Sequence, residues 1–167
     1  MLQKTLVFDM QHQLQDNWCW AAVSTSISIY FDENSGWTQC KMVNQALEET
    51  TCCNANSAST DTCNRQWYLH KALEKTGNLS QLERGAQTFE KIANEIREGR
   101  PLGCLIKWDD GEGGGHFVII SGVDEEEQTL DILDPWNGPT DDLPYNVFAK
   151  KYRGDGLWTY SFYTKNK

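Results

Sequence analysis

The sequence predicts an α+β protein in which helices come first and an antiparallel sheet follows. Three observations predict it. Apolar residues recur at helical spacing before Pro101, short β-branched and aromatic runs dominate after it, and no repeat or linker-like tract divides the 167 residues. We therefore expect one domain over residues 1–167, with a helical half at about 1–100 and a sheet half at about 101–167.

Four helices are expected in the first half. The first runs from Asn17 to Phe31, and Asp16 or Asn17 can cap its first turn, which places Cys19 at the start of a helix. The other three are expected at 39–49, at 65–76 before the stop signal Gly77-Asn78, and at 89–98 before Gly99 and Pro101.

The second half predicts a sheet. Strands are expected at 102–108, 116–123, 129–133 and 157–164. The acidic stretch 124–128 is typical of a hairpin turn, and a short helix at 144–151 would lead to the last strand. Cys104 lies in an apolar strand and is expected to be a buried thiol.

The loop at 50–64 is rich in Ser, Thr, Asn and Cys, and it needs covalent or metal bracing to stay ordered. Cys40, Cys52, Cys53 and Cys63 cluster around it, and two disulfides, a zinc site or free thiols are all open interpretations. Adjacent cysteines rarely bond to each other, so separate partners are expected for Cys52 and Cys53. No paired CxxC spacing supports zinc, so disulfides are favoured and no metal is expected.

Composition and charge exclude several classes of protein. Apolar residues make up 39% of the chain and charged residues 23%, as in ordinary globular proteins. No apolar stretch approaches the roughly eighteen residues that a membrane-spanning helix needs. A net charge of −9, without a long Lys/Arg cluster, argues against nucleic acid as a partner. No membrane partner is expected either.

The segment from Gln13 to Ala22, QLQDNWCWAA, is the most specific feature of the sequence. A thiol attacks as thiolate, and a helix N-terminus together with an imidazolium favours that form. Cys19 meets the helix condition; the alternative is a buried core cysteine. A Cys followed by Trp at a helix start, with a Gln six residues upstream, resembles the nucleophile segment of papain-like cysteine peptidases. The string NWCWAA resembles their bacterial branches, near the C39-like leader peptidases and the effector proteases of plant pathogens.

The resemblance implies a papain-like fold, with the nucleophile helix packed on an antiparallel sheet, and a base that reaches Cys19 from the other half. Only three histidines exist. His116 is favoured because it follows GEGGG and opens the apolar run FVIISGV. His70 lies within a predicted helix, and His12, seven residues before Cys19, is not excluded by spacing.

The third catalytic group is expected at Asp134. If the strands at 116–123 and 129–133 pair around a turn near residue 125, residue 134 lies opposite 116–118. The Asp-Pro dipeptide there also resembles the third catalytic position of the C39-like branch. Asn137 is the alternative, because papains use Asn, whereas Asp131 is expected to face solvent.

By resemblance, Gln13 and the backbone N–H of Cys19 would stabilise the oxyanion, with Gln11 and Gln15 as alternatives to Gln13. The implied function is a cysteine endopeptidase with a Cys19–His116–Asp134 triad, an acyl-enzyme and no cofactor. Cleavage after small residues such as Gly-Gly would follow from the C39-like resemblance.

The expected setting is a bacterial effector or toxin domain that cleaves a specific protein or peptide. Secretion, or injection into a target cell, is expected even though this chain shows no signal peptide. A cognate immunity or inhibitor protein is a candidate partner, and a monomer is expected. Two alternatives use the same residues or fold: a transglutaminase or glutamine deamidase, and a non-catalytic binding module.

Overall fold

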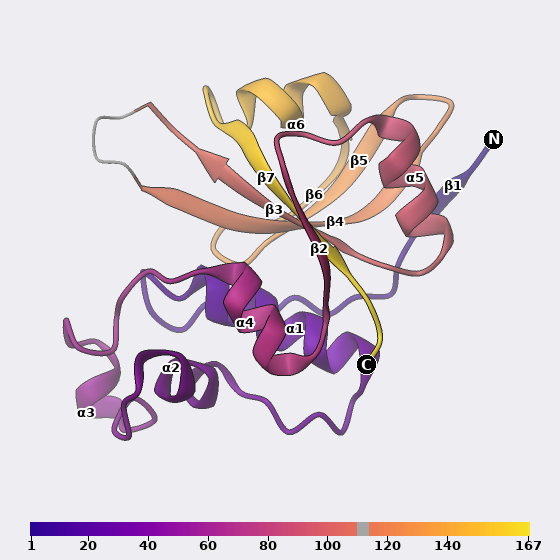
Figure 1. Ribbon diagram of the computed structural model, residues 1–167. Helices are drawn as coiled ribbons and strands as arrows, with labels where there is room; N and C mark the ends of the chain where they lie inside the picture. The colour runs from indigo at the N-terminus through magenta and orange to yellow at the C-terminus, as the bar shows by residue number, and fades with distance from the viewer. Residues whose placement is uncertain (110–113) are drawn as a thin grey trace.

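The computed structural model describes residues 1–109 and 114–167. Over these residues the chain forms six helices and a seven-stranded antiparallel sheet, which confirms the α+β prediction (Figure 1). Residues 111–113 of the GEGGG stretch lie outside the described part of the chain.

The helices are α1 (Cys19–Phe31), α2 (Gln39–Leu47), α3 (Ala55–Ala58), α4 (Leu69–Thr76), α5 (Phe89–Arg97) and α6 (Tyr145–Lys151). The strands are β1 (Gln3–Thr5), β2 (Leu79–Arg84), β3 (Leu102–Lys107), β4 (Gly115–Asp124), β5 (Thr129–Asp134), β6 (Gly138–Pro144) and β7 (Leu157–Thr164). The five predicted helices and four predicted strands are all present, with ends that differ by a few residues.

The division into a helical half at 1–100 and a sheet half after it is wrong at two places. β1 pairs with β4 and β2 pairs with β7, so the first hundred residues contribute two strands to the sheet. A third unpredicted strand, β6, pairs with β5. All three carry weak signals, because β1 has three residues, β2 is largely polar, and β6 contains two prolines.

The sheet separates two hydrophobic cores. Its strand order is β2-β7-β3-β4-β5-β6, with β1 added beside β4. Consecutive residues of a strand point to opposite faces: in β4, Phe117 and Ile119 pack into the core with α1, α2 and α4, and Val118 and Ile120 pack into the core with α5 and α6. In Figure 1, α1, α2 and α4 accordingly lie below the sheet, and α5 and α6 lie above it.

The β4–β5 hairpin determines where the site forms. Asp124 pairs with Thr129 and Ile119 with Leu133. Because the strands are antiparallel, the start of β4 and the end of β5 lie at the same end of the sheet. α1 packs against β4.

Two disulfides brace the loop after α2. One joins Cys40 to Cys53 and the other joins Cys52 to Cys63, so the adjacent Cys52 and Cys53 have separate partners. Cys104 is a buried free thiol in β3, and burial raises its pKa well above the usual value. Among the described residues, no helix combines the length and the apolar character needed to cross a membrane.

Candidate active site

Cys19 is the first residue of α1 and is almost fully buried, at 5% exposure. The predicted cap is wrong: Trp18 is the N-cap residue and no side chain caps the helix. The side chain and backbone N–H of Asn17 instead bind Asn64, at 3.0 and 2.9 Å. Within the described chain, no hydrogen bond engages the backbone N–H of Cys19. The positive end of α1 is therefore available to a negative charge at Cys19.

The tryptophans on either side of Cys19 anchor the helix start to the disulfide-braced loop. The indole N–H of Trp18 donates to the carbonyl oxygen of Cys63 at 2.8 Å, and that of Trp20 donates to Arg65 at 2.9 Å. Both indoles are buried, and buried N–H groups need partners. The loop thereby fixes the position of Cys19.

His116 lies between a thiol and a carboxylate. Its Nε2 is 2.7 Å from Oδ1 of Asp134, which leaves Nδ1 as the ring nitrogen available to a thiol. Burial disfavours the imidazolium, but hydrogen bonds with Asp134 and Cys19 and the charges of both groups outweigh it and raise the pKa of His116 to about 9.

Asp134 is buried at the end of β5 and is surrounded by donors. Besides His116, its Oδ1 accepts the backbone N–H of Trp136 at 2.8 Å and of Asn137 at 2.9 Å. Its Oδ2 accepts the side-chain amide of Asn137 at 3.0 Å and the hydroxyl of Tyr152 at 2.7 Å. Burial favours the neutral acid, but these bonds and the charge of His116 hold the pKa of Asp134 well below its usual range.

The alternative residues lie elsewhere or have other contacts. The exposed His12 stacks on Trp136, with ring centroids 5.6 Å apart, and His70 lies in α4. Asp131 accepts hydrogen bonds from Thr5 and from the backbone of Asp142. The structure thus brings together Cys19, His116 and Asp134. Asn137, the alternative third residue, contacts Asp134.

Gln13 is buried in the loop that leads to Cys19. Its side-chain nitrogen donates to the carbonyl oxygens of Gln15 and Asp16, at 2.9 and 2.8 Å, and its backbone N–H donates to Pro135 at 2.9 Å. Within the described residues, its side-chain oxygen is buried without a partner. Gln13 therefore links the Cys19 loop to the residue that follows Asp134. The side chain of Gln11 accepts from Gln39 instead.

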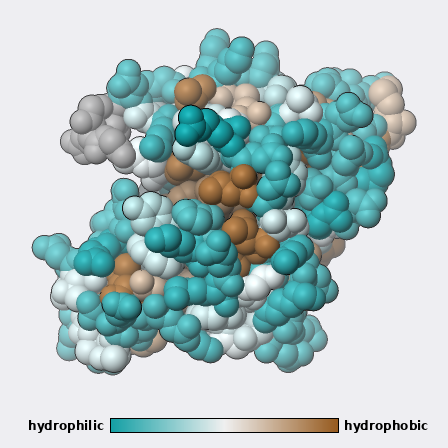
Figure 2. Space-filling view, viewed as in Figure 1, coloured by the Kyte–Doolittle hydropathy of each residue, from teal (hydrophilic) through white to brown (hydrophobic). Residues whose placement is uncertain are grey.

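A pocket of about 180 Å³ opens beside Cys19. It is lined by Cys19, Trp20, Gln66, Trp67, Tyr68, Leu105, Lys107, Gly115 and Phe117. Four of these, Tyr68, Leu105, Lys107 and Phe117, also line a neighbouring apolar groove over α4, β2 and β7. In the space-filling view, patches of hydrophobic residues are exposed near the middle of this face (Figure 2).

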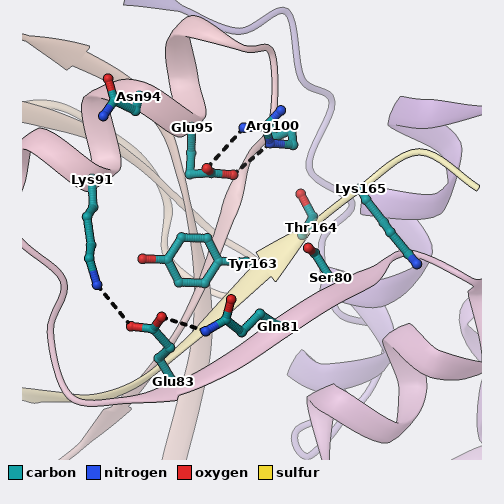
Figure 3. Close-up of a pocket in the computed structure, with 10 residues that line it drawn as sticks. All are labelled: Ser80, Gln81, Glu83, Lys91, Asn94, Glu95, Arg100, Tyr163, Thr164 and Lys165. Atoms are coloured by element: carbon teal, nitrogen blue, oxygen red, sulfur yellow. Dashed lines mark hydrogen bonds and ion pairs between the residues drawn. The ribbon is translucent and has the colours of Figure 1, made fainter.

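A separate polar pocket lies between β2 and α5 (Figure 3). Four of its charged side chains form two pairs: Lys91 lies 3.3 Å from Glu83, and Arg100 lies 2.7 Å from Glu95. None of the catalytic or oxyanion-binding residues predicted from the sequence lines this pocket. In residues 1–109 and 114–167, no cluster of three His, Cys, Asp or Glu side chains could hold a metal ion.

The sequence alone does not place Tyr152, which contacts Asp134, or the pocket residues Trp67, Tyr68 and Phe117 at the site. These residues reach the site through tertiary packing of α4, β4 and the turn after α6. No local motif marks Tyr152 or Phe117. Trp67 and Tyr68 belong to the WYL string after the cysteine-rich loop, which carries no mechanism by itself. The two tryptophans beside Cys19 gave a signal as part of the NWCWAA string.

The family model described as "Papain-like cysteine protease AvrRpt2" matches residues 2–153. Among solved structures, a double glycine motif protease from an AMS/PCAT transporter, in complex with its leader peptide, matches at a TM-score of 0.51 and 18% identity; the match covers 99% of this chain and 100% of that one. The comparison with curated proteins gave no significant match. The chain therefore belongs to the family of papain-like cysteine protease AvrRpt2, with a papain-like fold and the activity of a cysteine peptidase.

Proposed function

We propose that the chain hydrolyses peptide bonds through Cys19 as nucleophile, His116 as general base and acid, and Asp134 as the group that orients His116. The observation that carries this proposal is the 2.7 Å contact between Nε2 of His116 and Asp134, with Cys19 at an uncapped helix start on the other side of the ring. Each of the three lies on a different element, and each has the chemistry that its role needs.

The cycle begins with a proton on His116 and a thiolate on Cys19. The sulfur attacks the carbonyl carbon of the substrate amide, and the carbonyl oxygen takes the negative charge. As the C–N bond breaks, His116 gives its proton to the leaving amine, and an acyl-enzyme remains. His116 then takes a proton from water, whose oxygen attacks the thioester carbonyl. The acid leaves, and the thiolate and imidazolium are restored.

The oxyanion would lie against the backbone N–H of Cys19, which is the donor at the N-terminus of α1. We assign the second donor to the side-chain nitrogen of Gln13. That nitrogen donates to two carbonyl oxygens of its own loop, so it would share a hydrogen with the substrate oxygen. Gln13→Ala should then lower kcat by about 10²- to 10³-fold with little change in KM.

The substrate is proposed to be a protein or peptide with small residues, such as Gly-Gly, before the cleaved bond. The pocket beside Cys19 is small, at about 180 Å³, and aromatic side chains line much of it. At Gly115 a Cβ would lie 2.8 Å from Leu105, so this wall is already close-packed. The solved relative with a bound leader peptide is itself named for a double glycine motif.

A peptide library analysed by mass spectrometry tests this proposal. Fragments that end in Gly or Ala are expected to dominate, and equal cleavage after bulky residues would contradict the proposed preference. A product that stays intact and gains about one dalton would instead identify a deamidase, since a glutamine side chain would then have been attacked.

We further propose that the chain acts as a monomeric bacterial effector or toxin domain that is secreted or injected into a target cell. The family's naming protein, AvrRpt2, and the two disulfides support this, because disulfides persist in oxidising surroundings. Protein recovered from culture medium should be lighter than the reduced chain by two hydrogen atoms per disulfide. A fully reduced mass would contradict this route. An immunity or inhibitor protein remains a candidate partner.

A further inference from the structure

The carboxylate of Asp134 is held at both oxygens by different groups. Oδ1 faces His116 and also accepts the backbone N–H groups of Trp136 and Asn137, whereas Oδ2 accepts the hydroxyl of Tyr152 at 2.7 Å and the side-chain amide of Asn137 at 3.0 Å. A carboxylate that is bound at only one oxygen can rotate about its terminal torsion, which is broad. The contacts at Oδ2 act together with the backbone donors at Oδ1 to fix the plane of the carboxylate.

Tyr152 is fixed independently of Asp134. It is 1% exposed and lies just after α6, where its ring packs edge-on against Phe148 with centroids 5.4 Å apart. Its backbone exchanges two hydrogen bonds of 3.0 Å with Gly156. A Cβ at Gly156 would come within 2.5 Å of the Tyr152 carbonyl oxygen, so the turn is close-packed. The hydroxyl is therefore held in place as a hydrogen-bond donor to Asp134.

We propose that Tyr152 is a positioning residue for this peptidase: by holding Oδ2 of Asp134, its hydroxyl keeps Oδ1 directed at Nε2 of His116. The inference rests on the proposed roles of His116 and Asp134. Tyr152 acts through Asp134, as the outer partners of metal-binding histidines and carboxylates act through the groups they hold; at metal sites the loss of such a partner commonly lowers metal affinity or activity about 10- to 100-fold.

The other charged groups around Asp134 are weaker supports. Arg153 lies 3.8 Å from Oδ2, but its side chain is 43% exposed and water screens it. Asp9 and His12 of the N-terminal segment line a pocket that Asp134 also lines. His116 itself faces Cys19 from α1.

The hydroxyl of Tyr152 stays protonated over the working pH range. Burial, together with the negative charge of Asp134, raises the pKa of Tyr152 well above its usual value. The phenol therefore remains a hydrogen-bond donor to the carboxylate under the conditions in which the enzyme would act.

The direction in which the pKa of His116 changes distinguishes two possible effects of the Tyr152 hydroxyl. It could position the carboxylate of Asp134, or it could only withdraw charge from it. If Tyr152 positions Asp134, removal of the hydroxyl weakens the bond between Asp134 and His116, and the pKa of His116 falls from about 9 toward 6.5. If the hydroxyl only draws charge away from the carboxylate, its removal makes Asp134 a stronger partner, and the pKa of His116 rises.

The test is an NMR titration of the histidine Cε1–H signals in Tyr152→Phe, with Tyr145→Phe as the matched control. The hydroxyl of Tyr145 also makes a 2.8 Å hydrogen bond, but to the backbone of Gln87. The chain has three histidines, so His116→Gln assigns the signal. We expect the pKa of His116 to fall by about one pH unit in Tyr152→Phe and to stay unchanged in Tyr145→Phe.

An unchanged or raised pKa of His116 in Tyr152→Phe would overturn the proposal. If that variant does not fold, Asn137→Ala, at an exposed position, removes the other partner of Oδ2 and must lower the same pKa. The titration requires no peptide cleavage. Its failure leaves the peptidase chemistry standing, whereas an unreactive Cys19 in the native protein would overturn the proposed function instead.

Discussion

The imidazole of His116 has a different neighbour at each nitrogen, and this asymmetry is what the proposed chemistry uses. Asp134 fixes Nε2 and stabilises positive charge on the ring, and Nδ1 is left to exchange a proton with Cys19 and the substrate. Both charged partners are shielded from water, so their interaction is stronger than at a surface. At this scale, single substitutions should change rate and pH dependence more than they change folding.

Asp134→Asn removes the charge and keeps the shape. We expect kcat/KM to fall by about 10²- to 10⁴-fold, because the amide neither stabilises the imidazolium nor enforces the same tautomer. Asp131→Asn is the matched control, since Asp131 lies in the same strand and contacts Thr5. Steady-state kinetics on a cleaved peptide measure both. Equal activity of Asp134→Asn and the native protein would remove Asp134 from the mechanism.

Protonation of His116 also links stability to pH. Its pKa is about 9 in the folded protein against 6.5 for the free side chain, so the folded state holds this proton more tightly. The resulting stabilisation is fully present below pH 6.5 and is lost progressively as the pH rises to about 9. Urea unfolding at pH 6, 7.5 and 9 should show a falling free energy of unfolding, with a smaller fall in His116→Gln. Parallel curves for the two proteins would contradict the raised pKa.

Among the elements, the braced loop has the largest influence on the start of α1. The disulfide between Cys52 and Cys63 ends at the residue whose carbonyl accepts the indole of Trp18, and Arg65, two residues on, accepts Trp20. The disulfide between Cys40 and Cys53 ties the loop to α2 instead. Loss of one disulfide or the other should therefore have different effects on the reactivity of Cys19.

Replacing Cys52 and Cys63 by Ser should lower the free energy of unfolding by about 3 kcal/mol and also slow alkylation of Cys19, because the helix start loses its anchor. Replacing Cys40 and Cys53 should lower stability by a similar amount, since the loop closed is of similar length, and leave alkylation nearly unchanged. Chemical denaturation and timed mass spectrometry measure the two effects. Identical alkylation rates in both double variants would show that the loop does not position Cys19.

Elements with strong local patterns could be predicted, and elements defined by their partners could not. The spacing of apolar residues gave α1, and the runs at 116–123 and 129–133 gave the hairpin that aligns His116 with Asp134. β2 and β6 are edge strands with polar residues, so little in their own sequence marks them. Tyr152 lies 18 residues from Asp134 and reaches it only because α6 folds back over the sheet.

The whole molecule consists of two hydrophobic cores that share one sheet. β4 gives alternate residues to both, Ile119 to the core with α1 and Ile120 to the core with α5 and α6. The proposed site lies where the helices meet one end of this sheet, so its geometry depends on both cores. A single cooperative unit is expected, in keeping with the single domain predicted from the sequence.

Ile119→Ala and Ile120→Ala should each lower the free energy of unfolding by about 2–5 kcal/mol, because both side chains are fully buried. In each variant, tryptophan fluorescence and far-UV circular dichroism should report one coincident transition. Separate transitions would show that the two cores unfold independently, which would contradict the single-domain prediction.

The most direct test of the central claim is the intact mass of the protein after brief treatment with iodoacetamide at pH 6, with the disulfides left oxidised. At this pH an ordinary thiol is almost entirely protonated and reacts slowly, whereas a thiolate paired with an imidazolium reacts quickly. We predict rapid addition of one carbamidomethyl group at Cys19, none at the buried Cys104, and slow labelling in His116→Ala. Equal and slow labelling of both proteins would mean that His116 does not activate Cys19, and the proposed mechanism would be wrong.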